Sequence, residues 1–214
     1  MRHILVLNSK GGCGKSTIAT GVASYYADAG YNVALADFDP QASSLDWVAR
    51  RPETRAPIAP VAAFEDGLRR VPRKADIVVL DAPASSRGRE LKAMIKRSQT
   101  MIVPISPSVT DMSAANRFLH ELNKIGRVKK RKIRIAVVAN RVRESTCIFE
   151  ELDEYLEKKK IPYLTALRDS QNYIRAYERG IGIYEMPEYL AAVDWEQWDP
   201  LIEWLDSRRS RPKT

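Results

Sequence analysis

Short apolar segments alternate with longer amphipathic segments along the chain of 214 residues. Apolar runs of four or five residues have the length of buried strands rather than helices. We predict strands at Ile4–Leu7, Asn32–Ala36, Val61–Phe64, Ile77–Leu80, Met101–Pro104, Ile135–Ala139 and Tyr163–Leu167. Apolar residues at helical spacing predict helices at Ile18–Ala29, Glu65–Val71, Glu90–Arg97, Ser113–Ile125, Glu150–Lys160, Tyr173–Gly180 and Trp195–Leu205.

The order of these elements predicts the fold class. Strands that are apolar at nearly every position are typical of a parallel sheet covered by helices on both faces. We therefore expect an α/β three-layer sandwich around a mostly parallel, doubly wound sheet, in a single domain over residues 1–206. Residues 207–214, which include Arg208, Arg209, Arg211 and Lys213, are expected to form a basic, disordered tail.

Composition narrows the class of protein further. Hydrophobic residues make up 44% and charged residues 29%, which is ordinary for a globular protein, and no apolar run is long enough to span a membrane. The first residues lead directly into a strand, so we expect no secretory signal. Two cysteines, Cys13 and Cys147, provide no disulfide framework and suit a reducing cytoplasm.

The chain is basic, with a formal net charge of +8. This balance suits a polyanionic partner such as nucleic acid, although charge alone identifies none. Six of the eight residues from Arg127 to Arg134 are basic. They form either a solvated loop before the next strand or part of a DNA-binding face, for which Lys129, Lys130 and Arg131 are the candidates.

A glycine-rich segment, Lys10 to Thr17, joins the first strand to the first helix and reads K-G-G-C-G-K-S-T. Glycines let the backbone approach phosphates, and the N–H groups at a helix N-terminus face negative charge. In this arrangement Lys15 would reach the β- and γ-phosphates of ATP, and the Ser16 hydroxyl would bind Mg²⁺. The complete pattern between a strand and a helix favours this reading over a glycine-rich turn with two solvated lysines.

One departure from the usual pattern is informative. In G-x-x-x-x-G-K-[ST] the first glycine would fall at position 9, where this chain has Ser9, and Lys10 stands just before the glycine pair. K-G-G-x-G-K-[ST] resembles the deviant Walker A motif of the ParA/MinD family of dimerising ATPases. The resemblance implies that Lys10 crosses a dimer interface to the phosphates of the other subunit. It also implies nucleotide contacts by Gly11, Gly12, Cys13, Gly14, Lys15, Ser16 and Thr17.

Acidic residues follow two of the predicted strands. Carboxylates at the carboxyl ends of parallel strands, beside a phosphate loop, are well placed for Mg²⁺ and water. The segment D-F-D-P-Q at Asp37 to Gln41 resembles the family's switch I, which implies that Asp39 positions or activates the attacking water and Asp37 supports the metal shell. Ile77 to Asp81 has the Walker B pattern, which would bring the Asp81 carboxylate to Mg²⁺.

Later segments extend the resemblance over nearly the whole chain. It implies that Asn140, at a strand end, contacts the adenine base and that Arg168 and Asp169 lie near the base. Pro107 to Asp111 resembles the P-S-x-x-D segment beside the nucleotide and the dimer interface. Arg175 and Arg179 lie one helical turn apart, and either contact DNA phosphates, as basic residues of this region do in the family, or pair with Glu178 and Glu185.

The last predicted helix bears on membrane binding, because MinD proteins end in a membrane-targeting amphipathic helix. Here the polar face carries four acidic residues, which an anionic membrane surface would repel: Glu196, Asp199, Glu203 and Asp206. We therefore expect this helix to pack in the core and expect no membrane partner.

The resemblance is to small ParA-type partition and positioning ATPases, of the plasmid ParF-like or carboxysome-positioning McdA-like kind. It implies Mg²⁺-dependent ATP hydrolysis, an ATP-bound homodimer, non-specific binding to nucleoid DNA in the cytoplasm, and a ParB-like or adaptor partner that stimulates hydrolysis and carries the cargo. The cargo would be a plasmid, a chromosome region or a protein body such as a carboxysome. The alternatives are a metabolic member, either a dethiobiotin synthetase-like ligase or a reductase component, and a MinD-like membrane ATPase. The reductase component would need cysteines that hold an iron–sulfur cluster between two subunits. This is disfavoured because Cys13 lies in the phosphate loop and Cys147 has no partner cysteine.

Overall fold

The fold is built on one seven-stranded sheet, seen in a computed structural model that describes residues 1–84, 86, 88–143 and 146–212. The strand order is β3-β2-β4-β1-β5-β6-β7, and every neighbouring pair is parallel. The strands are β1 Arg2–Val6, β2 Val33–Asp37, β3 Ile58–Ala62, β4 Ile77–Asp81, β5 Thr100–Ile105, β6 Arg134–Val142 and β7 Tyr163–Arg168. The predicted parallel, doubly wound α/β fold is confirmed.

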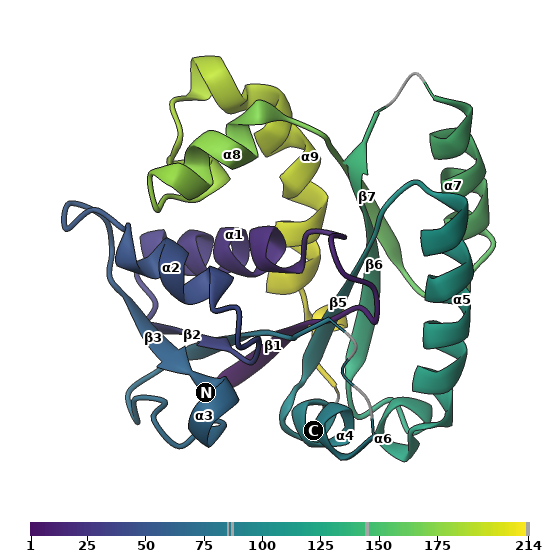
Figure 1. The fold of residues 1–214 in the computed structure, drawn as a ribbon, viewed down its shortest axis with the longest axis horizontal. Coiled ribbons are helices and arrows are strands. Elements are labelled where there is room, and N and C mark those ends of the chain that lie inside the picture. Colours follow the sequence, from purple (N-terminus) through teal and green to yellow (C-terminus); the bar gives the residue numbers. More distant parts are fainter. Residues whose placement is uncertain (85, 87, 144–145, 213–214) are drawn as a thin grey trace.

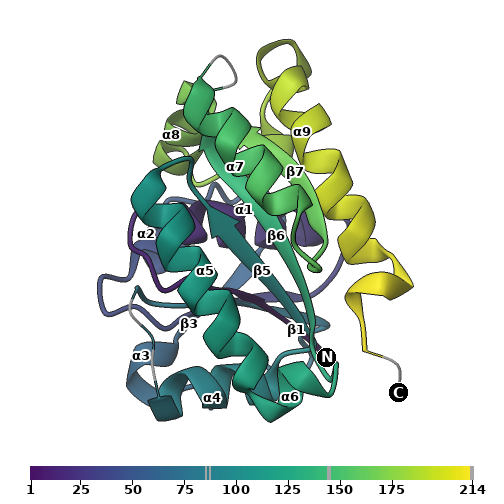
Figure 2. The ribbon, with the colours of Figure 1, turned by 90° about the vertical axis from the view of Figure 1, so that its right-hand side faces the viewer.

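Helices cover both faces of the sheet (Figures 1 and 2). One face is covered by α1 Lys15–Asp28, α2 Ser43–Ala49, α8 Gln171–Glu178 and α9 Glu188–Asp206. The other face is covered by α3 Ala63–Asp66, α4 Gly88–Arg97, α5 Val109–Lys124, α6 Gly126–Lys129 and α7 Cys147–Glu157. The described residues also form short 3₁₀ helices at Ile183–Glu185 and Arg208–Ser210.

Alternate residues of each central strand supply the two cores. Ile4 and Val6 of β1 belong to the core beneath α1 and α9, whereas Leu5 belongs to the core beneath α4 and α5. All three are completely buried. Because both faces of the strand are covered, its sequence shows an unbroken apolar run instead of an alternating pattern.

The last helix packs in the core, as the sequence predicted. Trp198, Leu201 and Leu205 of α9 are fully buried in the first core. Helix α1 approaches this helix so closely at Gly21 that an added Cβ would collide with the indole ring of Trp198. Within the described residues, no helix has the length and apolarity that a membrane span requires.

Several helices and strands differ from the predictions in their bounds, and the short helices α2 and α6 were not predicted. Strand β3 begins at Ile58 instead of Val61, because Pro60 interrupts the apolar pattern but is tolerated in a strand at the edge of the sheet. Helix α2 was not predicted, since it is too short to show a clear period. Helix α9 begins at Glu188, before the expected start at Trp195.

The expected disordered tail is ordered as far as it is described. Ser210 is fully buried, and its hydroxyl accepts a hydrogen bond of 2.9 Å from the Arg2 guanidinium. Its carbonyl accepts a second bond, of 2.7 Å, from the Thr100 hydroxyl. The buried Arg2 therefore fixes the position of the tail, and no pattern in the tail sequence indicates this contact. Lys213 lies outside the described residues.

Candidate functional site

The phosphate loop, residues 10–17, leaves β1 and enters α1 in the conformation that its glycines permit. Gly12 and Gly14 have φ angles of +77° and +84°, in the left-handed region that favours glycine. A Cβ on Gly14 would also collide with the Asn140 amide. Gly14 is the N-cap of α1 and provides no side chain to cap it, so the first N–H groups of the helix are available to an anion.

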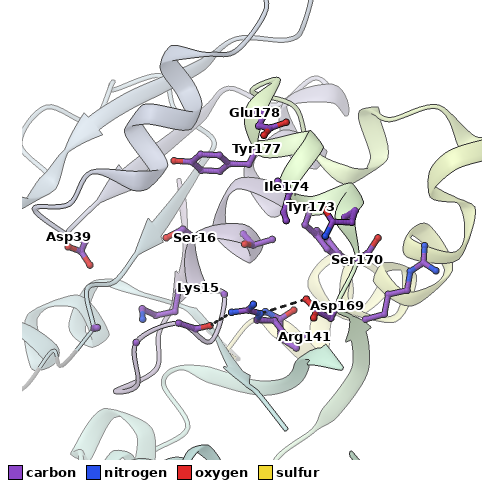
Figure 3. Close-up of a pocket in the computed structure, with 18 of the residues that line it drawn as sticks. Lys15, Ser16, Asp39, Arg141, Asp169, Ser170, Tyr173, Ile174, Tyr177 and Glu178 are labelled. Carbon is purple, nitrogen blue, oxygen red and sulfur yellow. Dashed lines mark hydrogen bonds and ion pairs between the residues drawn. The ribbon is translucent and has the colours of Figure 1, made fainter. Parts of the chain in front are cut away.

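A cavity of about 750 Å³ opens above this loop. Its size falls in the usual range of small-molecule and cofactor sites. Figure 3 shows the loop and the N-terminus of α1 on one side and α8 with the end of β7 on the other. The lining includes Gly11, Gly12, Gly14, Lys15, Ser16, Thr17, Asp39, Asn140, Arg141, Arg143, Arg168, Asp169, Ser170, Tyr173, Ile174, Tyr177 and Glu178.

The two lysines of the loop lie differently. Lys15 is buried, lines the cavity and donates from Nζ to the carbonyl oxygen of Lys10, at 3.0 Å. The Lys10 side chain is 43% exposed, and its Nζ lies 3.5 Å from Asp111 Oδ1. Asp111 is in the first turn of α5, in the segment predicted to lie beside the interface. Of these two lysines, Lys15 is among the described residues that line the cavity and Lys10 is not.

Two buried carboxylates stand side by side at the carboxyl ends of β2 and β4. Asp37 and Asp81 are register partners, and their exposed fractions are 0% and 1%. Ser44, in the first turn of α2, links them, because its hydroxyl donates to Asp81 Oδ2 and its N–H donates to Asp37 Oδ2. Burial raises the pKa of Asp37, and it raises the pKa of Asp81 to about 6, although the hydroxyls of Ser16 and Ser44 act in the opposite direction.

This arrangement fits a magnesium ion. Asp81 Oδ1 is buried and has no hydrogen-bond partner among the described residues, and the Ser16 hydroxyl lies beside the same carboxyl. Carboxylate and hydroxyl oxygens beside bound phosphates are the ligands that Mg²⁺ prefers. Both oxygens of Asp37 accept backbone N–H groups, from Asp39 and Ser44, so this carboxylate holds the segment that surrounds the metal position.

Asp39 lies half-buried on the cavity wall, and its role in positioning water stays a prediction. Its N–H donates to Asp37 Oδ1 and its own Oδ1 accepts from the N–H of Gln41, at 3.0 Å. Ala42, which follows, has a φ of +56°. The segment is therefore a tight turn fixed by side-chain bonds to the backbone.

Asn140 and Arg141, at the end of β6, both contact the phosphate loop. Asn140 is buried and donates from Nδ2 to the Cys13 carbonyl at 2.8 Å, so it lies at the cavity but holds the loop. Arg141 donates to the Gly12 carbonyl at 3.3 Å and has a φ of +59°. A non-glycine residue in this region stores on the order of 1–3 kcal/mol. Sequence reasoning assigned no role to Arg141.

Arg168 and Asp169 line the cavity, but each is engaged by another side chain. The Arg168 guanidinium forms a bidentate pair with the fully buried Asp194 of α9, at 2.7 and 3.0 Å. Asp169 accepts from Arg143 at 3.1 Å and lies 3.9 Å from Arg141. Their contact with a base stays a prediction, and Asp194, which the sequence analysis missed, explains the orientation of Arg168.

The candidate DNA contacts fall at opposite ends of the sheet (Figure 1). Arg175 and Arg179 belong to the helical region beside the cavity, and both are exposed. Neither forms an ion pair with a described residue, and Glu185 pairs instead with Arg51. Lys129, Lys130 and Arg131 are also exposed but lie at α6, which precedes the amino end of β6.

A glycine loop at a helix N-terminus, with buried carboxylates at the ends of neighbouring parallel strands, defines a nucleotide-binding protein of the phosphate-loop class. Residues 4–183 match the CobQ/CobB/MinD/ParA nucleotide-binding domain, and the chain belongs to this family. It is therefore one of the nucleotide-binding ATPases of the ParA/MinD type.

Individual relatives agree with this assignment. The chain is 25% identical over 193 residues to the maintenance of carboxysome distribution protein A of Halothiobacillus neapolitanus, covering 86% of this chain and 87% of the relative. The structure resembles that of a Cyanothece McdA variant in complex with ATP, with a TM-score of 0.69, 15% identity, and coverage of 94% and 96% of the two chains. It also resembles Pyrococcus horikoshii MinD complexed with Mg-ADP, with a TM-score of 0.72, 16% identity and 96% coverage of both chains.

Several cavity residues were missed by sequence reasoning. Tyr173, Ile174 and Tyr177 of α8 form one wall, with Ile174 half exposed. The Tyr177 hydroxyl donates to the Ser43 carbonyl at 2.9 Å and so joins α8 to the start of α2. The spacing of residues 173 and 177, one helical turn apart, is the signal that could have placed them on one face.

Proposed function

We propose that this chain hydrolyses ATP with Mg²⁺ and acts as a positioning ATPase that dimerises when ATP is bound. The observation that supports a dimer is that the two lysines of the loop lie in different places. Lys15 lines its own cavity, whereas the partly exposed Lys10 is outside that lining and pairs with Asp111. An ammonium group on the same loop that does not line its own cavity is available to the phosphates of a second copy.

The proposed chemistry is in-line attack of water on the γ-phosphate. Asp39 would accept a hydrogen bond from the water and orient it, and Lys15, with Lys10 of the second copy, would balance the charge on the phosphoryl oxygens. Ser16 and Asp81 would hold Mg²⁺, which supplies further charge stabilisation when bound. Asp37 would keep the Asp39 turn in place through its backbone bonds.

We further propose that Arg175 and Arg179 contact DNA phosphates without sequence preference. Both are exposed and neither forms an ion pair with a described residue, so their charge is available to a polyanion. Helix α8 also lines the cavity, and Tyr177 connects it to the segment that follows Asp39. This connection supports DNA affinity that depends on the nucleotide. The basic residues at α6 lie at the other end of the sheet and are the alternative face.

The proposed setting is the cytoplasm, on the nucleoid, with a ParB-like or adaptor partner that stimulates hydrolysis and carries a cargo. The similarity to a carboxysome distribution protein makes a protein body of that kind the first cargo to examine, ahead of a plasmid or a chromosome region.

Binding to random-sequence duplex DNA tests the proposal. We expect wild-type protein to bind with ATP and Mg²⁺ but not with ADP or without nucleotide, and Lys10→Ala to lose this binding. The double variant Arg175→Glu/Arg179→Glu should lose it too, while the matched charge reversal Lys129→Glu/Lys130→Glu should bind within about threefold of wild type. No DNA binding at low salt under any nucleotide would overturn the DNA proposal, and loss only in the α6 variant would move the DNA face to α6.

A further inference from the structure

The end of β6 is bent by a bulge. Asn140 pairs with Leu167 and Val142 pairs with Arg168, so Arg141 is an extra residue between two consecutive register positions. Arg141 has a φ of +59°. Successive side chains of a regular strand point to opposite faces, and a bulge re-aims one of them. Here the bulge allows the side chains of both Asn140 and Arg141 to reach the same loop.

The two side chains bind two consecutive carbonyl groups of the phosphate loop. Asn140 Nδ2 donates to the Cys13 oxygen at 2.8 Å, and Arg141 Nη1 donates to the Gly12 oxygen at 3.3 Å. A loop that binds phosphate through its N–H groups must direct its carbonyl groups elsewhere, because a carbonyl oxygen would repel the anion. The end of β6 provides donors for both carbonyls.

The identity of the residue supports a role for its side chain. Glycine would adopt a φ of +59° without strain, so the backbone alone gives no reason for an arginine here. The Arg141 guanidinium lies between the loop and Asp169, whose Oδ1 is 3.9 Å from Arg141 Nε (Figure 3). The carboxylate holds the guanidinium from the side away from the loop.

We propose that Arg141 is a positioning residue that holds the Gly12 carbonyl away from the phosphates, so that the loop presents its N–H groups to the nucleotide. The proposal rests on ATP binding at this loop, not on DNA binding or dimerisation. A failure of the DNA experiment therefore leaves it standing.

The test compares two arginines that share the left-handed conformation, Arg141 at the loop and Arg131, with a φ of +52°, at the other end of the sheet. Replacement by glycine relieves the strain at either position but removes the loop contact only at Arg141. The measurements are the Kd of a fluorescent ATP analogue with Mg²⁺ and the melting temperature without nucleotide. We expect Arg141→Gly to raise the Kd about tenfold with no fall in melting temperature, and Arg131→Gly to leave the Kd within about twofold.

A conservative variant shows whether the affinity depends on the donated hydrogen bond or only on the size of the side chain. In Arg141→Lys the ammonium can donate to the same carbonyl, so part of the lost affinity should return. A wild-type Kd for Arg141→Gly would overturn the proposal, as would a loss in Arg141→Lys equal to that in Arg141→Gly. A lower melting temperature for Arg141→Gly with an unchanged Kd would assign a purely structural role to the residue and would also overturn it.

Discussion

The two ends of the sheet use charged side chains in opposite ways. At the amino end, the buried Arg2 guanidinium donates to the Leu205 carbonyl and to the hydroxyls of Thr100 and Ser210, which ties the C-terminal segment to the strands. At the carboxyl end, the buried Asp81 keeps one oxygen without a hydrogen-bond partner among the described residues. Arg2 uses both of its terminal nitrogens for bonds within the chain, and among the described residues only its Nε lacks a partner, whereas Asp81 keeps a carboxylate oxygen available for a ligand.

This difference separates stability from function within one fold. Removing a charge that the chain itself pairs costs folding free energy, because its partners lose their bonds in a buried place. Removing a charge that is kept for a ligand costs binding and leaves folding nearly unchanged. Variants at the two ends should therefore give opposite results in binding and melting measurements.

The largest expected effect is at Lys15. Lys15→Ala should weaken ATP binding by about a thousandfold, because a buried ammonium makes charge-assisted bonds to the phosphates. The melting temperature without nucleotide should change little, since the hydrogen bond that Lys15 donates within the described part of the chain goes to a loop carbonyl. Isothermal titration calorimetry and a thermal melt would measure the two quantities. A strong fall in melting temperature would contradict the proposed difference between Lys15, which serves binding, and Arg2, which serves stability.

The opposite result is expected at Arg2. Arg2→Met should lower the free energy of unfolding by about 3 kcal/mol, because buried acceptors at Leu205, Thr100 and Ser210 lose a charged donor. Its affinity for ATP should match that of wild type, since the cavity lies at the other end of the strands. Urea unfolding and the same calorimetric titration would show this, and a loss of affinity as large as the loss of stability would contradict it.

The pKa of Asp81 predicts a dependence on pH. Burial raises this pKa to about 6, so protonation below that pH removes the charge that Mg²⁺ needs. Affinity for the Mg²⁺–nucleotide complex should fall about tenfold between pH 6 and pH 5. Asp81→Asn should lack this step. The stability of the ligand-free fold should depend on pH in the opposite direction to the affinity. Because the pKa of Asp81 is raised on folding, its contribution to the free energy of unfolding is greatest at low pH and is lost as pH rises through about 6. A pH-independent affinity in wild type would contradict the assignment.

The smallest effect is expected at Asp111. Asp111→Asn removes the ion pair that holds Lys10 in its own chain, a partly exposed pair that contributes about 0.5–1 kcal/mol. The lysine would then move to a second copy more easily, so the ATP-bound dimer should form at a two- to fivefold lower protein concentration. Sedimentation velocity over a concentration series would detect the shift, and a weaker dimer would contradict it.

Local pattern predicted most of the fold and the chemical groups of the site. The apolar runs that became β1, β2 and β4 are almost completely buried, as their unbroken apolar pattern predicted, and the loop glycines and strand-end aspartates have recognisable spacing. Residues that act through distant partners were missed. The bonds of Ser44 to Asp81 and of Arg2 to Ser210 join residues far apart in sequence, and the conformation of Arg141 depends on pairing with β7. Periodicity carries no information about such contacts.

The central claim is that Lys10 acts in a second copy of the chain. Light scattering of the wild type and of Lys10→Ala, each with ATP and Mg²⁺ and each with ADP, measures this most directly. The account predicts twice the monomer mass for wild type with ATP, and the monomer mass for wild type with ADP and for the variant with either nucleotide. A dimer of Lys10→Ala as stable as that of wild type, or a wild type that stays monomeric with ATP, would contradict it.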